Sequence, residues 1–252
     1  MRKENLNILI ACEESQTFTK VFRKLGHNAF SCDVKTSSGG FDQYHIQGDA
    51  LEIAHDTSFN WNLMIGHPPC TFISGASRGW LSHKEDKHLN IFERRRHPLF
   101  PNRMEDALKA LEFVYLLASA PIDHIAIENP LGLLNQKDFI DFFDKEGIVP
   151  SFMKEKPMII QPYQFGDHYQ KRSCFWLQNL PKVPPTVSKE NWNKGEMIQV
   201  KKKNGRIQNV PRWYNDARDL NDYERKEVRS KSFPLMSKAI AKTFINHIQE
   251  SK

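Results

Sequence analysis

Four short apolar runs, separated by polar and helical segments, constrain the fold of this chain more than any other feature. They span residues 6–11, 28–32, 63–65 and 124–127. A continuous apolar run of this length is typical of a strand buried on both faces of a parallel sheet. Between the first two runs, apolar side chains recur at helical spacing from Phe18 to Leu25, and Gly26 is placed to end the helix. This alternation predicts an α/β fold with a parallel sheet.

Composition limits the classes of protein to which the chain can belong. It has 252 residues, 39% of them hydrophobic and 26% charged, which is typical of a soluble globular protein. We expect no signal peptide, no membrane span and a cytoplasmic monomer. The four cysteines lie far apart without a C-x-x-C pair, which argues against a zinc site and for reduced thiols. A net charge of +6 favours a polyanionic partner.

Two turns with reactive side chains follow neighbouring apolar runs. Cys70 comes after Pro68 and Pro69, which end the third run and stiffen the turn. Glu128 stands at the carboxyl end of the fourth run. Ligands of open α/β sheets bind beside these strand ends, so a thiol and an acid there suggest covalent catalysis with a proton donor. The alternative is that Glu128 only caps the following turn.

The first turn and the next strand ends suggest a cofactor site. Glu13 and Glu14 occupy a turn that would need small, uncharged residues to bind a diphosphate. Two acids suit S-adenosylmethionine better, because it has no phosphate and carries a positive centre. Ser15 is expected to cap the helix, Asp33 to bind a ribose hydroxyl and Asp49 to bind the adenine amino group. The alternative is that the acids only complement the helix dipole and that Asp49 is an ordinary loop residue.

The order of these motifs resembles that of the DNA cytosine-5 methyltransferase family, most closely its compact phage and prophage versions. The Pro-Pro-Cys and Glu-Asn-Pro turns carry the most specific part of the resemblance. The resemblance covers nearly the whole chain. The segments that match are residues 12–16, 31–33, 48–49, 67–71, 127–130, 165–166, 170–177 and 180–186.

The resemblance implies a Rossmann-like class I S-adenosylmethionine-dependent methyltransferase fold with a small basic target-recognition insertion. It implies that Cys70 attacks C6 of cytosine and that Glu128 assists at N3. The family's second arginine helps to hold the flipped base, a role that here falls to Arg172 or to another residue. The implied cofactor is S-adenosylmethionine, bound by Glu13, Ser15, Asp33 and Asp49, with no metal. The implied partner is double-stranded DNA, from which the target base is flipped.

Three departures from the family pattern keep alternatives open. The first motif lacks glycines, Cys174 stands where a second arginine is usual, and the last motif is degraded at residues 229–234. The same fold could act on RNA cytosine, transfer another group to C5, or survive as an inactive DNA-binding relative. A Cys70 packed in the core would favour the inactive relative.

The resemblance also divides the chain. We expect a catalytic core over residues 1–177, a target-recognition region over 178–228, and a C-terminal helix over 229–252 that packs back on the core. Asn204-Gly205 predicts a basic hairpin that could place lysines on phosphates and aim Arg206 or Gln208 at a groove. The alternative is a solvated hairpin. The basic segment between Thr71 and Arg103 is expected to be either a mobile lid or a surface loop.

Overall fold

The chain divides into two compact units. The computed structural model describes residues 4–202, 204–221, 224–225, 228 and 233–251. The first unit comprises Met1–Ile159 and Ser173–Leu180, and the second comprises Ile160–Arg172 and Pro181–Lys252. The C-terminal helix therefore belongs to the same unit as the hairpin region and the segment 160–172. Packing of that helix on the catalytic core stays a prediction.

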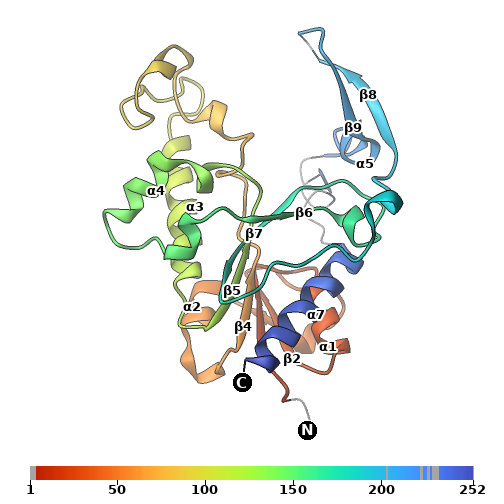
Figure 1. Ribbon diagram of the computed structural model, residues 1–252. Helices are drawn as coiled ribbons and strands as arrows, with labels where there is room; N and C mark the ends of the chain where they lie inside the picture. Colours follow the sequence, from red (N-terminus) through yellow and green to blue (C-terminus); the bar gives the residue numbers. More distant parts are fainter. Residues whose placement is uncertain (1–3, 203, 222–223, 226–227, 229–232, 252) are drawn as a thin grey trace. The chain divides into compact units, whose positions relative to one another are not determined.

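The first unit is built on a seven-stranded sheet with the order β3-β2-β1-β4-β5-β7-β6 (Figure 1). Pairs β1–β2, β1–β4, β2–β3 and β4–β5 are parallel, and β7 runs antiparallel beside β5. A mainly parallel sheet of this order is Rossmann-like, so the predicted Rossmann-like α/β fold is confirmed. The strands are β1 Asn7–Ala11, β2 Asn28–Asp33, β3 His45–Gln47, β4 Leu63–Gly66, β5 His124–Glu128, β6 Met158–Ile160 and β7 Ser173–Gln178.

Four helices of the first unit cover the two faces of the sheet. In Figure 1, α2, α3 and α4 lie on one face and α1 lies on the other. The sequence predicted α1 and α3 to within about two residues at each end, but it did not predict α2 or α4. Among the described residues, no helix is long and apolar enough to cross a membrane. The helices are α1 Thr17–Lys24, α2 Ala50–His55, α3 Arg103–Ala118 and α4 Lys137–Asp144.

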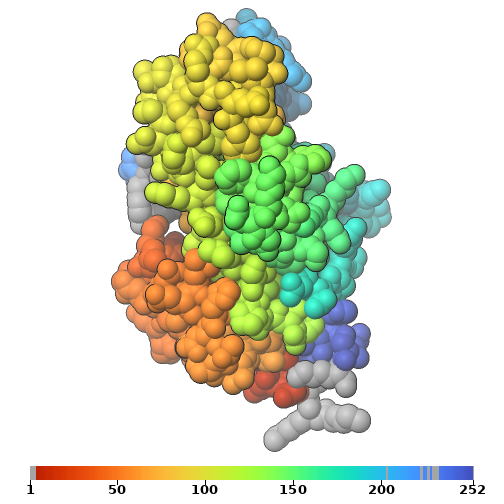
Figure 2. Space-filling model, turned by 90° about the vertical axis from the view of Figure 1, so that its left-hand side faces the viewer, coloured from red at the N-terminus to blue at the C-terminus, as the bar shows by residue number. Residues whose placement is uncertain are grey.

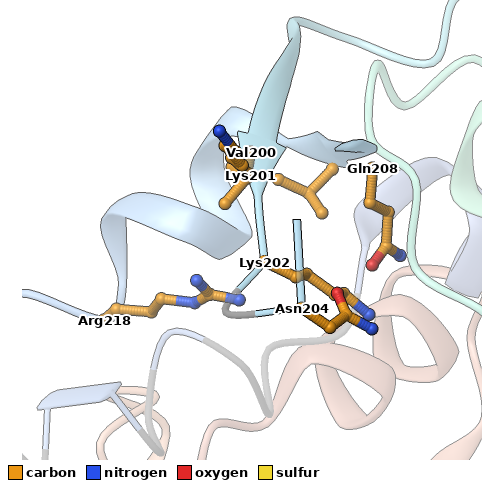
Figure 3. A pocket seen from close by; sticks show the side chains of 7 residues that line it. Val200, Lys201, Lys202, Asn204, Gln208 and Arg218 are labelled. Carbon is orange, nitrogen blue, oxygen red and sulfur yellow. The ribbon is translucent and has the colours of Figure 1, made fainter. Parts of the chain in front are cut away.

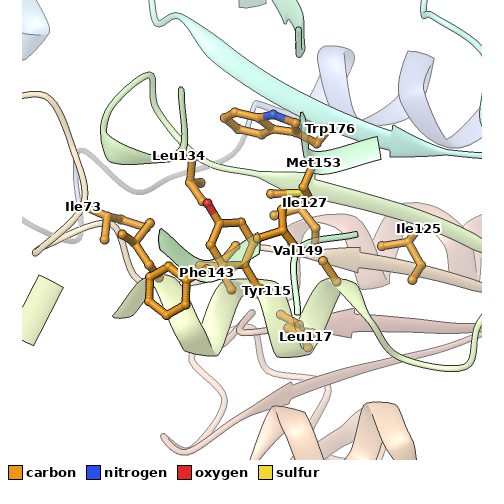
Figure 4. Close-up of a cluster of buried hydrophobic side chains, with 14 of the residues drawn as sticks. Ile73, Tyr115, Leu117, Ile125, Ile127, Leu134, Phe143, Val149, Met153 and Trp176 are labelled. Atoms are coloured by element: carbon orange, nitrogen blue, oxygen red, sulfur yellow. The ribbon is translucent and has the colours of Figure 1, made fainter. Parts of the chain in front are cut away.

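A glycine in β4 allows α3 to lie close to the sheet. A Cβ on Gly66 would come within 3.0 Å of Ile127 Cδ1 and 3.1 Å of Leu117 Cδ2. Both of these side chains are fully buried, and Leu117 belongs to α3. Figure 4 shows them in the cluster of apolar side chains on this side of the sheet, with Tyr115 beside them. The face of the sheet toward which Gly66 points is therefore filled by the core.

Tyr115 buries a hydroxyl inside this cluster. Its side chain is fully buried, burial raises its pKa, and its hydroxyl has no hydrogen-bond partner among the described residues. An unpaired buried hydroxyl is destabilising, so we expect Tyr115→Phe to raise the free energy of unfolding by about 1 kcal/mol. Chemical denaturation of both proteins measures this difference. A loss of stability would instead show that the hydroxyl is hydrogen-bonded, for example to a buried water.

The second unit contains the predicted hairpin and the C-terminal helix. Strands β8 and β9 pair antiparallel, and Gly205 has a φ of 80°, so the Asn-Gly hairpin is confirmed. The carboxylate of Asp167 accepts from the amide N–H groups of Leu235 and Met236 and thereby caps α7. Residues 229–232 of the degraded last motif lie outside the described residues. The elements are β8 Met197–Lys201, β9 Ile207–Pro211, α5 Arg212–Asp216 and α7 Pro234–Glu250.

Candidate active site

Four side chains capable of acid–base or thiol chemistry lie at the same level along the carboxyl edge of the sheet. In the parallel register, Ala11 is paired with Cys32 on one side and with Gly66 on the other, and Gly66 is paired with Ile127. Successive side chains of a strand point to opposite faces, so the next residues along β2, β4 and β5, which are Asp33, His67 and Glu128, point away from the core that Gly66 faces. The fourth, Cys12 after β1, has a left-handed φ of 59° and packs against that core instead.

The structure places His67 beside Glu128. The amide N–H of His67 donates to the carbonyl of Ala11 at 2.9 Å, which continues the ladder one residue beyond β4. Its Nδ1 lies 3.6 Å from Oε2 of Glu128, and the two side chains are only 14% and 18% exposed. The imidazole packs on Phe18 of α1 with 5.2 Å between ring centroids. The sequence did not predict a role for His67, although its position three residues before Cys70 offered a signal.

Cys70 lies on an exposed turn that the end of β5 holds in place. The thiol is exposed and does not form a disulfide. Asn129 is 1% exposed, and its Nδ2 donates to the carbonyl of Pro68 at 2.9 Å. Its amide N–H donates to the carbonyl of Cys174 in β7 at 3.0 Å. Asn129, which was not a predicted site residue, therefore ties the turn that carries Cys70 to the strand end that carries Glu128.

A second connection joins the segments that follow these two turns. The amide N–H of Leu133 donates to the carbonyl of Ile73 at 2.8 Å, and Ser74 and Gly132 form an antiparallel bridge. A Cβ on Gly132 would lie 2.0 Å from the carbonyl oxygen of Ile73, so only glycine permits this approach. The Pro-Pro-Cys and Glu-Asn-Pro turns are thus held together on both sides of Cys70, by the Asn129 side chain before it and by backbone contacts after it.

Glu13, and not Ser15, caps α1. The helix begins at Thr17, and the carboxylate of Glu13 accepts from the amides of Phe18 at 2.6 Å and Thr19 at 3.2 Å. It also accepts from the hydroxyl of Thr19 at 2.8 Å. Burial raises the pKa of Glu13, while the charge of His67 and these hydrogen bonds oppose the shift. The prediction that Ser15 caps the helix was wrong, because the carboxylate of Glu13 folds back and binds the free amide groups of the first turn. Whether either residue binds a cofactor stays a prediction.

The glycine-poor first turn adopts a backbone conformation that usually requires glycine. Cys12 and Gln16 have φ values of 59° and 56°. Gln16 is fully buried, and its Oε1 accepts from the hydroxyl of Ser37 at 2.8 Å and the amide of Phe41 at 3.0 Å. A Cβ on Gly39 would lie 2.5 Å from the same Oε1. Buried hydrogen bonds to the loop 37–41 therefore hold this turn.

Asp33 and Asp49 occupy the edge beside the first turn. Oδ1 of Asp33 accepts from the amide of Lys35 at 2.9 Å, and Oδ1 of Asp49 accepts from the amide of Leu51 at 2.8 Å, which caps α2. Burial, together with the charges of both aspartates, raises the pKa of Cys32 to about 12. The same causes raise the pKa of Cys12. The carboxylates of Asp33 and Asp49 therefore both lie near the end of β1, where their charges raise the pKa of Cys12 and of Cys32.

Three consecutive arginines of the basic segment after Cys70 are paired with nearby groups of the same unit. The guanidinium of Arg95 pairs with Asp86 at 2.7 Å, and that of Arg96 pairs with Glu105 at 2.7 Å. Arg94 donates to the carbonyl of Leu89 at 2.8 Å. Figure 2 shows the segment in yellow, gathered at the surface of the first unit. These pairs favour an ordered surface segment over a lid whose arginines bind a partner.

The Asp86–Arg95 pair makes the order of this segment testable. Hydrogen bonds from the side chain and amide of Arg95 hold the pKa of Asp86 well below its usual range. A depressed pKa means that the pair stabilises the segment above about pH 4 and that this stabilisation is lost as the pH falls further. We expect Asp86→Asn to accelerate tryptic cleavage at residues 84–96 several-fold at neutral pH. Glu93→Gln, at an exposed neighbouring position, serves as the control and should cleave like the wild type.

The remaining predicted site residue belongs to the second unit. Arg172 is exposed and immediately precedes β7, so its expected role at the base stays a prediction. Cys174, which stands where the family has a second arginine, is fully buried in β7. Among the described residues, no three His, Cys, Asp or Glu side chains gather in a way that could hold a metal ion.

Comparisons with known proteins give distant structural matches. No protein-family model and no curated protein sequence matches the chain. The structure is similar to the Dnmt2 methyltransferase of S. pombe, with a TM-score of 0.41, 13% sequence identity, and coverage of 69% of this chain and 49% of that one. It is also similar to a mutant DNMT2 of Spodoptera frugiperda, with a TM-score of 0.34, 14% identity, and coverage of 83% and 58%. The chain spans about half the length of these structures.

Proposed function

We propose that the chain is an S-adenosylmethionine-dependent methyltransferase that acts on C5 of cytosine in double-stranded DNA. One observation carries the proposal. The exposed turn with Cys70 is hydrogen-bonded through Asn129 to the strand end with Glu128, at the edge where ligands of such sheets bind. A thiol and a carboxyl group held on joined turns suit nucleophilic addition with proton transfer. A Cys70 packed in the core would have favoured the inactive relative, but the thiol is exposed.

The proposed chemistry assigns complementary roles to the two side chains. The thiolate of Cys70 forms a bond to C6 of the cytosine, and the electron pair of the C5–C6 double bond moves toward N3. Glu128 gives a proton to N3 as that charge arrives, so its O–H bond breaks as the N3–H bond forms. C5 then becomes nucleophilic enough to accept a methyl group. Water takes the C5 proton as the thiolate is eliminated and the C5–C6 double bond forms again, and the N3 proton returns to Glu128, so that the aromatic ring, Cys70 and the acid are all restored.

The residues at the end of β1 and β2 fit a cofactor with a positive centre. S-adenosylmethionine would supply the methyl group from its sulfonium. Asp33 and Asp49 would bind its ribose and adenine, since each uses Oδ1 in its own turn and no hydrogen bond from the described residues reaches Oδ2. Ser15 and the backbone of the Cys12–Gln16 turn would line the methionine end. Glu13 would act indirectly, by fixing the start of α1 through its cap.

The hairpin of the second unit supports a nucleic-acid substrate. A cavity of about 520 Å³ opens beside β8 and β9, and Figure 3 shows the side chains of both strands and of Arg218 around it. Three cations and two amides line it, a combination suited to phosphate oxygens and groove edges. The lining residues are Val200, Lys201, Lys202, Asn204, Gln208, Val210 and Arg218.

We expect removal of these cations to weaken DNA binding in a salt-dependent way. In Lys201→Ala/Lys202→Ala, each lost phosphate contact should reduce the slope of log K against log salt by about 0.9. The loss of affinity should be similar for all DNA sequences, because phosphate contacts carry no sequence information. Fluorescence anisotropy at several salt concentrations measures both quantities. Lys145→Ala, on the exposed surface of the first unit, is the matched control. An unchanged slope in the double variant would exclude this surface from DNA binding.

The proposed activity is tested by methyl transfer to defined substrates. The purified protein is incubated with methyl-labelled S-adenosylmethionine and either double-stranded DNA or RNA, and the products are digested to nucleosides. 5-Methyldeoxycytidine is the expected product. 5-Methylcytidine alone would move the substrate to RNA, and label in neither nucleic acid would favour the binding relative. Expression in a host without DNA methylation provides the same test when the recognition sequence is unknown.

A further inference from the structure

We propose that His67 is a positioning residue for Glu128, holding its carboxyl group and stabilising the carboxylate that remains after proton transfer to cytosine N3. This inference rests on the proposed function and extends it to a residue outside the predicted site. It starts from the distance of 3.6 Å between His67 Nδ1 and Glu128 Oε2.

The backbone fixes this pair before any substrate binds. His67 and Glu128 each follow a paired residue of adjacent parallel strands, because Gly66 is in register with Ile127. Their side chains therefore leave the sheet at the same level and toward the same face. The hydrogen bond from the amide of His67 to Ala11 keeps this register beyond the end of β4. The pairing follows from the sheet and does not depend on a flexible loop.

The imidazole is held in a mostly buried environment between two carboxyl groups. Phe18 packs on the ring, and Nε2 is buried without a hydrogen-bond partner among the described residues. On the side of β1, Glu13 is near enough for the charge of His67 to lower its pKa. Since both oxygens of Glu13 accept hydrogen bonds from the first turn of α1, that carboxylate is already committed to the helix. Glu128 is the carboxyl group on which His67 can act in the reaction.

The proposed effect is greatest after proton transfer. Before the reaction, Nδ1 of His67 lies 3.6 Å from Oε2 of Glu128, slightly beyond hydrogen-bond distance. When Glu128 gives its proton to N3, a negative charge forms on its oxygens, and the Nδ1–H group then closes this gap and donates to a charged acceptor in a site with little water. Hydrogen bonds to charged groups are stronger than neutral ones, so the stabilisation increases along the reaction.

An isosteric pair of variants separates this role from simple packing. His67→Asn keeps an N–H donor near the position of Nδ1, whereas His67→Leu has a similar volume and no donor. The assay measures single-turnover formation of a covalent adduct with a duplex that contains 5-fluorocytosine at the target position, from which elimination is blocked. We expect His67→Leu to slow adduct formation by about 100-fold and His67→Asn by less than about tenfold. S-adenosylmethionine affinity and melting temperature should change equally in both variants.

Each outcome of this experiment decides the inference. Equal rates for the two variants, slow or fast, would show that His67 acts by packing alone or does not act. If His67→Leu does not fold, His67→Gln replaces it, because its amide reaches the position of Nε2 and not that of Nδ1. If the wild type forms no adduct, the proposed function fails together with this inference. A normal adduct in the wild type and in both variants overturns only the role of His67.

Discussion

Cys70→Ser is expected to abolish methyl transfer and the covalent adduct with 5-fluorocytosine. A hydroxyl is a far weaker nucleophile than a thiolate near neutral pH, and no other exposed cysteine exists among the described residues. Turnover should fall at least about 10³-fold, because removing the nucleophile removes the covalent route altogether. Tritium transfer from labelled S-adenosylmethionine measures the rate. Denaturing electrophoresis of the fluorinated duplex detects the adduct.

A buried cysteine provides the matched control for this substitution. Cys32 is fully buried, and burial together with the neighbouring aspartates raises its pKa to about 12, so its thiol cannot ionise near neutral pH. Cys32→Ala should lower the stability of the protein while the adduct still forms. If Cys70→Ser kept the adduct and Cys32→Ala lost it, the nucleophile would be assigned wrongly.

Gly132→Ala is expected to lower both the stability and the activity of the protein strongly. The added Cβ would lie 2.0 Å from the carbonyl oxygen of Ile73 and 2.8 Å from Cα of Ser74, and both neighbours are backbone atoms that cannot rotate away. The two turns would have to separate. We expect a loss of roughly 2–3 kcal/mol in the free energy of unfolding, as in other overpacked sites, with a large loss of activity. Urea denaturation and the methyl-transfer assay measure the two effects.

A second glycine in the same region tests whether the effect is specific. A Cβ on Gly79 meets no heavy atom within 4 Å, and its backbone conformation is available to other residues. Gly79→Ala should therefore leave stability and activity close to those of the wild type. A stable and active Gly132→Ala protein would show that the contact between the two turns is not required for the reaction.

The sequence predicted the framework of the first unit well because continuous apolar runs that alternate with helical segments leave few alternative folds. Each run became a parallel strand, and the helical spacing from Phe18 became α1. It did not predict α2, whose single turn and a half carries too little periodicity. The residues of β7 were predicted only as a family motif and not as a strand, because the antiparallel pairing with β5 has no local signal in the sequence. Elements defined by long-range pairing are the ones that a single sequence specifies least.

The site was predicted less completely, because its contacts join residues distant in sequence. Cys70 and Glu128 could be paired from strand order alone, but the roles of His67 and Asn129 depend on register. The cap on α1 illustrates the same limit. A serine two residues before the helix looks like a cap, yet a glutamate further back reaches the free amides because the turn between them takes a left-handed conformation at Gln16.

Cys12 and Gln16 show that the first turn requires left-handed backbone angles but does not require glycine. Glycine is usual at such positions because it has no Cβ, but it also adds conformational freedom that is lost on folding. In this chain Cys12 and Gln16 adopt the same backbone angles, and the buried amide of Gln16 holds the turn against the loop 37–41. The turn is therefore pre-organised by side-chain contacts. In this chain, a buried amide facing a small residue, Gly39, takes the place of the glycines that such a turn usually contains.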